Sequence, residues 1–198
     1  EFSSLIGSGA GAIGVNNAIF CNGANMAYRK EIFLEVNQFS IDTAVSGDDV
    51  FLLHSVKAKY PNSVAFAKDK SAIVMTDAVQ TFSGFINQRK RWTAKSSGYK
   101  DNASIYTSFL VLFTNLAFVF LFAIPFWNIE YFNLFILFYG VKFLVDLILL
   151  FPILKFFNRT DLVKWILPFE IFYSFYIVLI VVLSFTKSFE WKGRVHSK

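Results

Sequence analysis

Three long apolar runs in the second half of the chain constrain its fold more than any other feature. They extend over residues 105–127, 131–154 and 166–186 and are rich in Phe, Leu, Ile and Val. A helix needs about 20 apolar residues to cross the hydrocarbon of a bilayer, and each run reaches that length. With 55% hydrophobic residues in 198, the chain also has more apolar surface than a small soluble core needs. The sequence therefore predicts an integral membrane protein with about three transmembrane helices.

Two of the apolar runs contain charged residues. The second run includes Lys142 and Asp146, which are one helical turn apart and can partly neutralise each other inside the membrane. The third run has Pro168 and Glu170 near its start, where we expect the carboxylate to reach the interface. Both runs are predicted to span the bilayer. Because of the charged pair, the alternative for the second run is a re-entrant segment that does not cross.

Basic residues before the first run indicate its orientation. They are Arg89, Lys90, Arg91, Lys95 and Lys100. Because segments rich in Lys and Arg stay on the cytoplasmic side, the residues before the first span are predicted to be cytoplasmic. Three crossings would then place the basic tail, residues 187–198, outside. Either the tail is external despite its charge, or one run is re-entrant.

The first half of the chain is predicted to be a mixed α/β region made of short elements. Short apolar stretches predict strands at residues 18–21, 64–66 and 72–75. Capping and charge patterns predict helices at residues 30–36, 49–60 and 79–92. The last of these helices has apolar residues along one side and a cationic end, which is typical of a helix in the membrane interface.

Glycines between residues 7 and 14 include a formal G-x-G-x-x-G at Gly9, Gly11 and Gly14. This fingerprint binds a dinucleotide only where a helix follows the glycines at once, whereas residues 15–17 lead into a predicted strand. We therefore reject a dinucleotide site and expect a flexible loop. The one cysteine, Cys21, cannot form an internal disulfide, and its apolar surroundings favour a buried thiol over a nucleophile.

Two neighbouring acids, Asp48 and Asp49, follow Ser46 and Gly47 at a predicted helix start. A carboxylate in this position can act as a general base, although helix capping explains a single acid equally well. A second acid exceeds what capping requires, which favours a site. The segment 22–30 places small residues beside amides that can hydrogen-bond hydroxyl groups, and a structural turn between a strand and a helix explains these residues equally well.

Residues 88–92 have the sequence Gln-Arg-Lys-Arg-Trp. Helical spacing places Gln88, Arg91 and Trp92 on one face and turns Arg89 and Lys90 away. A guanidinium group binds phosphate oxygens in a forked geometry and an indole ring stacks on a sugar, so this face suits a sugar phosphate. The alternative is an ordinary basic helix beside the membrane with a Trp at the interface. A nucleic-acid interface is not expected, because the patch directly precedes a membrane run.

These motifs together resemble the membrane-bound family 2 glycosyltransferases. The resemblance rests on CNGANMAYRKE at Cys21–Glu31, SGDD at Ser46–Asp49, QRKRW at Gln88–Trp92 and the spans that follow. That family includes synthases of cellulose, chitin and hyaluronan and also single-addition enzymes that act on lipids. The resemblance implies an α/β fold in which a partial GT-A catalytic domain is followed by transmembrane helices. The implied regions are the C-terminal half of the GT-A domain at 1–78, an amphipathic interfacial helix at 79–103, the membrane region at 104–186 and a basic tail at 187–198.

The resemblance also implies roles for single residues. Asp49 matches the base that deprotonates the acceptor, and Asp48 stands where many relatives have Glu. The matches to substrate-binding positions are Gln88 and Arg91 near the donor diphosphate, Trp92 on the acceptor sugar, and Gly23, Ala24 and Asn25 in the acceptor loop. In the family an Asp-x-Asp motif binds a divalent metal, Mg²⁺ or Mn²⁺, and this sequence lacks the motif. Because residue 1 is not Met, we expect a fragment. Because the Asp-x-Asp motif is absent, we expect that this fragment cannot turn over alone and that the metal ligands lie mostly upstream.

The expected function is inverting transfer of a sugar from a nucleotide-sugar donor to a saccharide or lipid acceptor. The expected location is the cell (inner or plasma) membrane, with the catalytic part on the cytoplasmic side. Membrane lipids are expected partners, and nucleic acid is not. The alternative is a non-enzymatic multi-pass transporter or channel subunit in which Lys142 and Asp146 line a pathway.

Overall fold

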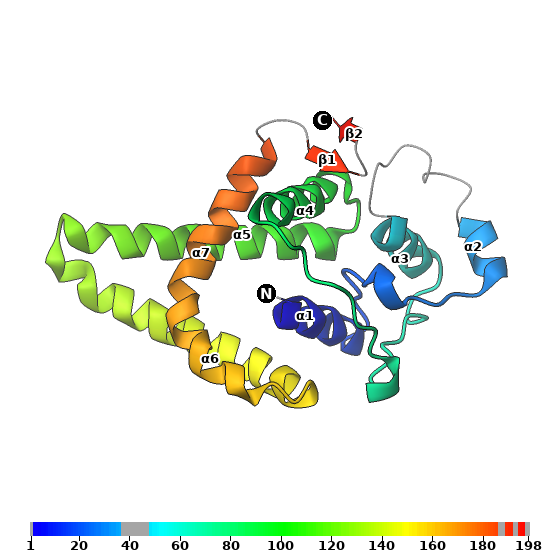
Figure 1. Cartoon of the computed structure of the whole chain (residues 1–198), viewed down its shortest axis with the longest axis horizontal. Coiled ribbons are helices and arrows are strands. Elements are labelled where there is room, and N and C mark those ends of the chain that lie inside the picture. The colour runs from blue at the N-terminus through cyan, green and yellow to red at the C-terminus, as the bar shows by residue number, and fades with distance from the viewer. Residues whose placement is uncertain (1, 37–47, 186–188, 192–193, 197–198) are drawn as a thin grey trace. The chain divides into compact units, whose positions relative to one another are not determined.

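The computed structural model of the chain describes residues 2–36, 48–185, 189–191 and 194–196. The chain divides into two compact units, and helices predominate in both (Figure 1). The membrane unit comprises residues 1–8 and 107–181. The motif unit comprises residues 9–106 and 182–198, and it contains all three sequence motifs.

Three long helices make up most of the membrane unit. They are α5 (Asn102–Ala123), which begins in the motif unit, α6 (Phe132–Phe156) and α7 (Val163–Phe185). Short 3-10 turns join them, namely η6 (Ile124–Phe126), η7 (Ile129–Tyr131) and η8 (Thr160–Leu162). With these turns, residues 102–126, 129–156 and 160–185 are long and apolar enough to cross a membrane. The three predicted spans are therefore confirmed as candidate membrane helices.

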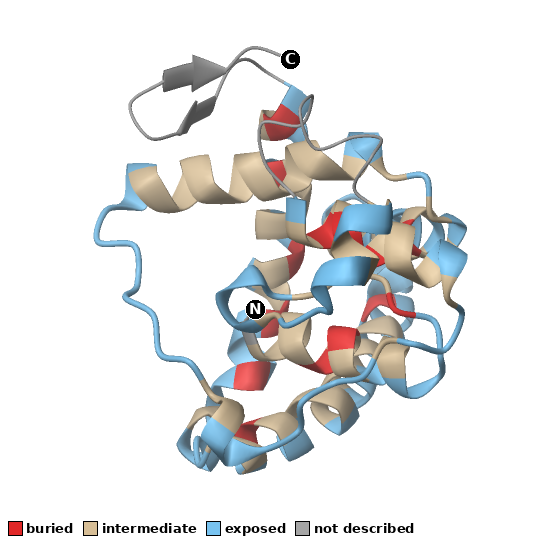
Figure 2. Cartoon of the chain, turned by 90° about the vertical axis from the view of Figure 1, so that its right-hand side faces the viewer, coloured by how far each residue is buried: buried red, intermediate tan, exposed pale blue. Residues whose placement is uncertain are grey.

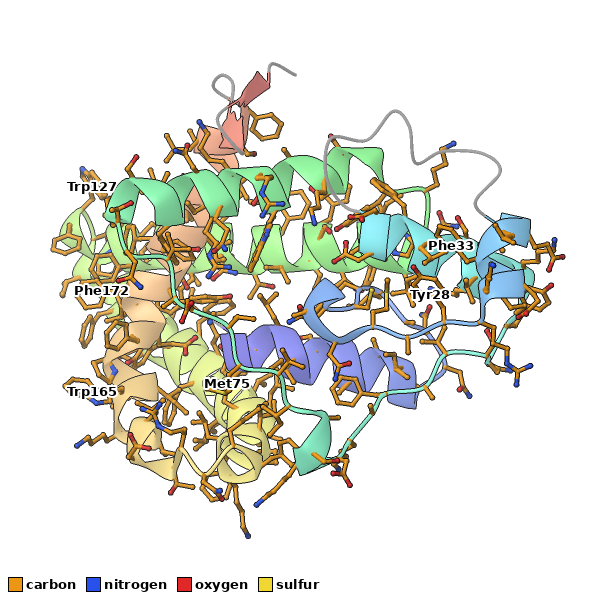
Figure 3. The ribbon with its side chains drawn as sticks, turned by 45° about the vertical axis from the view of Figure 1, so that its right-hand side comes forward. Tyr28, Phe33, Met75, Trp127, Trp165 and Phe172 are labelled. Atoms are coloured by element: carbon orange, nitrogen blue, oxygen red, sulfur yellow. The ribbon has the colours of Figure 1, made fainter. Side chains whose placement is uncertain are left out.

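Aromatic side chains pack the interior of the membrane unit. Phe118 is fully buried, and its ring centroid lies 5.7 Å from that of Phe135 and 5.9 Å from that of Tyr139. Many other large apolar side chains on the three helices are exposed, as expected for surfaces in contact with lipid. Trp127 and Trp165, labelled in Figure 3, are exposed and lie before and after α6 in the chain, where interfacial Trp residues are common.

A charged cluster joins α6 to α7 inside the membrane unit. Lys142 Nζ donates to Asp146 Oδ2 at 2.8 Å, which confirms the predicted pair, and it also donates to Glu170 Oε1. Glu170 is only 4% exposed and pairs with Lys142. Charged side chains within membrane helices usually pair with one another, as these three side chains do.

The motif unit consists of short helices connected by extended segments. Its helical elements are the end of α1 (Phe2–Gly14), η1 (Gly23–Asn25), α2 (Lys30–Val36), α3 (Asp48–Lys59), η4 (Lys70–Ala72), α4 (Phe82–Lys95) and η5 (Ser96–Gly98). The helices predicted at 30–36, 49–60 and 79–92 are present as α2, α3 and α4. The last begins later than expected, because the Thr81 side chain caps it by accepting from the Gly84 N–H at 3.1 Å.

The expected α/β fold with a partial GT-A domain is wrong. The segments 18–21, 64–66 and 72–75 form no strands, and in the described part of the chain strands occur only as the hairpin of β1 (Phe189–Trp191) and β2 (Arg194–His196). This antiparallel pair aligns Glu190 with Val195. A short apolar stretch becomes a strand only if a neighbouring strand satisfies its backbone groups. The Ile19 carbonyl instead lies 3.0 Å from Ser104 Oγ and 2.9 Å from His54 Nε2.

The flexible loop expected at the glycine cluster is also wrong, since residues 2–14 form helix α1. Small residues let this helix approach its neighbours closely. A Cβ atom at Gly7 would overlap Ile153 Cδ1, and one at Gly9 would lie 3.2 Å from the Phe20 ring. The helix is terminated by Asn16, whose φ of 56° is the left-handed conformation common at helix C-termini.

Candidate functional site

Asp49 lies in the first turn of α3, where the helix dipole favours a carboxylate. Its Oδ1 atom accepts a hydrogen bond from the Val50 N–H at 2.9 Å and lies 3.7 Å from Lys95 Nζ. The Asp49 side chain is 21% exposed, whereas the neighbouring Asp48 is exposed to solvent. Of the two predicted acids, Asp49 is therefore the one held in a defined environment. The preceding Ser46 and Gly47 lie outside the described residues.

Gly23 lies against the second oxygen of the same carboxylate. A Cβ atom built on Gly23 would be 3.0 Å from Asp49 Oδ2, closer than ordinary van der Waals contact. No hydrogen bond to Oδ2 is found within the described residues. The two oxygens thus differ: Oδ1 is anchored, and Oδ2 faces a residue without a side chain. This asymmetry suits a general base, which must keep one oxygen accessible to a proton donor.

The rest of the acceptor-loop prediction, Ala24 and Asn25, forms η1 with Gly23. The Asn22 side chain caps this turn by accepting from the Ala24 N–H at 3.1 Å. Asn25 Nδ2 donates to the Ala72 carbonyl at 2.6 Å, so at least one of its amide hydrogens holds the loop to η4. The loop that carries Gly23 is therefore fixed from both sides.

Cys21 lies on the backbone side of Asp49. Its Sγ atom is 3.4 Å from the Asp49 carbonyl oxygen and 3.6 Å from Met26 Sδ. Burial, followed by the negative charge of Asp49, raises the pKa of the Cys21 thiol to about 12. The thiol is therefore protonated at neutral pH, which agrees with the prediction that Cys21 is not a nucleophile.

Helix α4 supplies the cations that face Asp49. Burial lowers the pKa of the Arg91 guanidinium, and the negative charge of Asp49 partly offsets that effect. Arg91 thus lies close enough to sense the carboxylate. Residues 84–96 are all half-buried, so α4 has no fully solvated face (Figure 2).

The predicted grouping of Gln88, Arg91 and Trp92 is only partly observed. Among the described residues, no hydrogen bond, ion pair or ring contact joins Gln88 or Trp92 to Asp49. The expectation that Arg89 turns away from Trp92 is wrong, because its guanidinium carbon lies 4.2 Å from the Trp92 ring centroid and 4.8 Å from that of Phe85. Such a cation–π contact between residues three apart fixes the indole and covers one of its faces.

Sequence reasoning missed two residues of this site, Lys95 and Tyr99. Lys95 was counted only among the basic residues before the membrane, although it follows Arg91 by four positions on the same helical face. Tyr99 packs edge-on against His54 at 5.3 Å between ring centroids. Burial and then the charge of Asp49 raise the pKa of Tyr99 to about 12. Tyr99 is therefore an uncharged side chain that lines the site at neutral pH.

The site combines a half-buried carboxylate with cations on one side and a small-residue loop on the other. Such an arrangement can remove a proton from a hydroxyl group and attract an anionic substrate. Residues 2–36 and 48–185 contain no group of three or more His, Cys, Asp or Glu side chains that could hold a metal ion.

The comparisons with known proteins place the chain in a family. The family model for glycosyl transferase family group 2 matches residues 7–191, which is nearly the whole chain of 198 residues. No curated protein and no solved structure shows significant similarity to it. The matched residues include the Asp49 site, helix α4 and all three candidate membrane helices. The chain therefore belongs to glycosyl transferase family group 2, and its chemistry is glycosyl transfer.

Proposed function

We propose that this chain supplies the acceptor side of an inverting glycosyltransferase in which Asp49 is the general base. The observation that carries the proposal is the asymmetry of the Asp49 carboxylate, anchored at Oδ1 by the Val50 N–H and facing Gly23 at Oδ2. Family membership supports transfer of a sugar in general. It also favours an enzyme over the alternative of a non-enzymatic transporter or channel subunit.

The proposed donor is a nucleotide sugar, and the proposed acceptor is a saccharide or a lipid. The oxygen of an acceptor hydroxyl attacks the anomeric carbon while the bond from that carbon to the diphosphate breaks. The nucleoside diphosphate leaves with the bonding electron pair, and the hydroxyl proton passes to Asp49 Oδ2. Attack opposite the leaving group inverts the anomeric configuration. Asp48 stays a second candidate carboxylate at the same helix start.

The residues of α4 have proposed roles in substrate binding. Arg91 would pair with oxygens of the donor diphosphate, with Gln88 one turn earlier on the same face. Trp92 would stack on the acceptor sugar through the indole face that Arg89 does not cover. Ala24 and Asn25 would line the acceptor side next to Gly23.

Two parts of the proposal concern groups beyond the described site. A divalent metal, Mg²⁺ or Mn²⁺, is proposed for the enzyme, but the described residues hold no cluster of His, Cys, Asp or Glu ligands that fits it. Its ligands are expected mostly outside residues 1–198. The cations at residues 89–100 support a cytoplasmic position for the motif unit at the cell membrane. A synthase of the cellulose, chitin or hyaluronan kind is the proposed subtype.

The test is sugar transfer by membranes that contain the full-length enzyme, with radiolabelled UDP-glucose, UDP-N-acetylglucosamine and GDP-mannose as donors. Asp49→Asn should lower transfer by at least about a hundredfold, because general bases contribute on that scale. Asp48→Asn should have a smaller effect, since Asp48 is exposed. The exposed Asp77 provides the matched control, and Asp77→Asn should transfer at the wild-type rate. Wild-type transfer by Asp49→Asn would contradict the proposal.

A further inference from the structure

We infer that Tyr28, supported by Phe33, is a binding platform for a saccharide acceptor and holds a sugar residue beyond the one that reacts beside Asp49. The inference rests on the proposed function, in which Asp49 is the base, and extends the acceptor side past the loop of Gly23. The group recognised is a pyranose ring, which a free oligosaccharide and the sugar part of a glycolipid share.

The rings of Tyr28 and Phe33 are stacked (Figure 3). Their centroids are 5.1 Å apart and their planes are inclined by 21°. This contact supports one face of the Tyr28 ring, while the residue as a whole stays 50% exposed. In the parts of the chain that the structure describes, no hydrogen bond to the Tyr28 hydroxyl is found. The side chain therefore offers an apolar ring and a polar tip together, which suits the C–H face and the hydroxyl groups of a sugar.

Helix α2 connects this aromatic pair to the helix that carries Asp49. Glu35 of α2 accepts a hydrogen bond from the Tyr60 hydroxyl at 2.5 Å and also pairs with Lys59. Lys59 is the last residue of α3, and Asp49 lies in the first turn of the same helix. Groups held by helices are positioned more precisely than groups on free loops. The platform and the base thus belong to one connected pair of helices.

The surface between Gly23 and Tyr28 is open. Residues 22–31 are exposed, apart from Met26, which is half-buried. Three of the exposed residues carry no side chain larger than a methyl group, namely Gly23, Ala24 and Ala27. With η1 at one end, the two Cα atoms are at most about 14 Å apart, because a 3-10 helix rises about 2 Å and an extended chain about 3.3 Å per residue. A short oligosaccharide can cover that distance, whereas a single sugar beside Asp49 cannot.

The charge around the platform favours a sugar over a lipid phosphate group. The exposed cations Arg29 and Lys30 are followed by two exposed carboxylates, Glu31 and Glu35. Residues 28–36 therefore carry no net charge, whereas binding of anionic lipid depends on an excess of cations. Since the chemistry of the family is glycosyl transfer, a sugar is also the class of ligand that the enzyme must bind.

Transfer by the full-length enzyme to added acceptors tests the inference, using whichever of the three labelled donors supports transfer. The acceptors are glucose, N-acetylglucosamine and the corresponding trimers, cellotriose and chitotriose. The wild-type KM should be lower for the better trimer than for its monosaccharide. Tyr28→Ala should raise the KM for that trimer by about tenfold and leave kcat and the monosaccharide KM unchanged, because the ring contacts only the outer sugar. Tyr28→Phe keeps the ring and should raise the trimer KM by only about threefold.

Binding of the two trimers to the detergent-solubilised full-length enzyme, measured by isothermal titration calorimetry, gives a readout that needs no donor. Tyr28→Ala should weaken this binding by about tenfold in the wild-type background and equally in the Asp49→Asn background, because the two residues do not touch the same sugar. Tyr28→Leu keeps apolar bulk without a ring and should bind as weakly as Tyr28→Ala. It replaces the alanine variant if the latter does not accumulate.

Phe66 provides the matched control, because it is an exposed aromatic residue of the same unit. Phe66→Ala should leave the trimer KM and the trimer affinity unchanged. Equal trimer affinity in wild type and Tyr28→Ala would overturn the inference. An enzyme that binds neither trimer and accepts only a lipid would also overturn it. The proposed function fails separately, through wild-type transfer by Asp49→Asn, and the calorimetric result does not depend on that outcome.

Discussion

Gly23 and Asp49 are in direct contact, and the space beside Asp49 Oδ2 exists because residue 23 has no side chain. A Cβ atom there would lie 3.0 Å from Oδ2, so the carboxylate would have to move. We expect Gly23→Ala to lower sugar transfer by at least about tenfold, because small displacements of a catalytic group are costly. The measurement is transfer of the labelled sugar by membranes with matched protein content. Gly11→Ala is the control, since a Cβ atom at Gly11 meets nothing within 4 Å.

The thiol of Cys21 should react very slowly with alkylating agents. Its pKa is raised from 9.0 to about 12, which lowers the thiolate fraction at pH 8 by about a thousandfold. Alkylation of the folded protein by iodoacetamide, followed by mass spectrometry, should be correspondingly slower than that of glutathione. The rate should continue to rise with pH well above pH 9, because a raised pKa delays ionisation. Alkylation of Cys21 at pH 8 at the rate of glutathione would contradict this prediction. The urea-unfolded protein is the positive control, in which Cys21 should react at the rate of an ordinary thiol.

The cluster of Lys142, Asp146 and Glu170 predicts an asymmetric response to mutation. Lys142→Met leaves two carboxylates without their cation inside the membrane unit, and breaking such a buried group costs about 3–5 kcal/mol. The variant should unfold at a clearly lower temperature in detergent. Adding Asp146→Asn and Glu170→Gln to the Lys142→Met variant should recover most of the lost unfolding temperature, because none of the three positions then carries an unpaired charge. A wild-type midpoint for Lys142→Met alone would show that the cluster does not stabilise the unit.

Asp101 should make the motif unit sensitive to acid. Burial pushes the pKa of Asp101 upward, but hydrogen bonds from Lys57 and Ser104 outweigh burial and hold the pKa below its usual value of 3.8. A carboxyl group with a lowered folded-state pKa stabilises the fold above its unfolded-state pKa, and this contribution is lost as the pH falls through the folded-state pKa. Wild-type protein should therefore lose thermal stability below about pH 4, whereas Asp101→Asn should show a weaker dependence from a lower starting midpoint. Asp77→Asn is the control, and an equal pH dependence in Asp101→Asn would contradict the prediction.

The elements that the sequence predicts correctly are those with local signals. The apolar runs establish the membrane helices by their length, and the i,i+4 spacing of Lys142 and Asp146 establishes their pair. Helix α3 is marked by acids in its first turn and by Lys57 and Lys59 in its last turn. Each of these signals lies within a few residues of the structure that it specifies, so no knowledge of the tertiary contacts is needed.

The expectations that fail depend on partners far away in the sequence. The strand expected at residues 18–21 does not form, because groups at residues 54 and 104 satisfy the Ile19 carbonyl. The glycine cluster forms a helix in contact with Ile153, which no local pattern reveals. In the site, helical spacing already places Lys95 next to Arg91. Only the folded chain shows that Asp49 faces Lys95 and that Arg89 covers Trp92.

Contacts of the Ser104 hydroxyl fix the axial position of the first turn of α5. It lies within hydrogen-bond distance of Ile19 O at 3.0 Å, His54 Nε2 at 2.9 Å and Asp101 Oδ2 at 2.9 Å. Sliding α5 along its axis by one residue would move this hydroxyl by about 1.5 Å and break these contacts together. The first turn of α5 is therefore tied to residues 19, 54 and 101 of the motif unit.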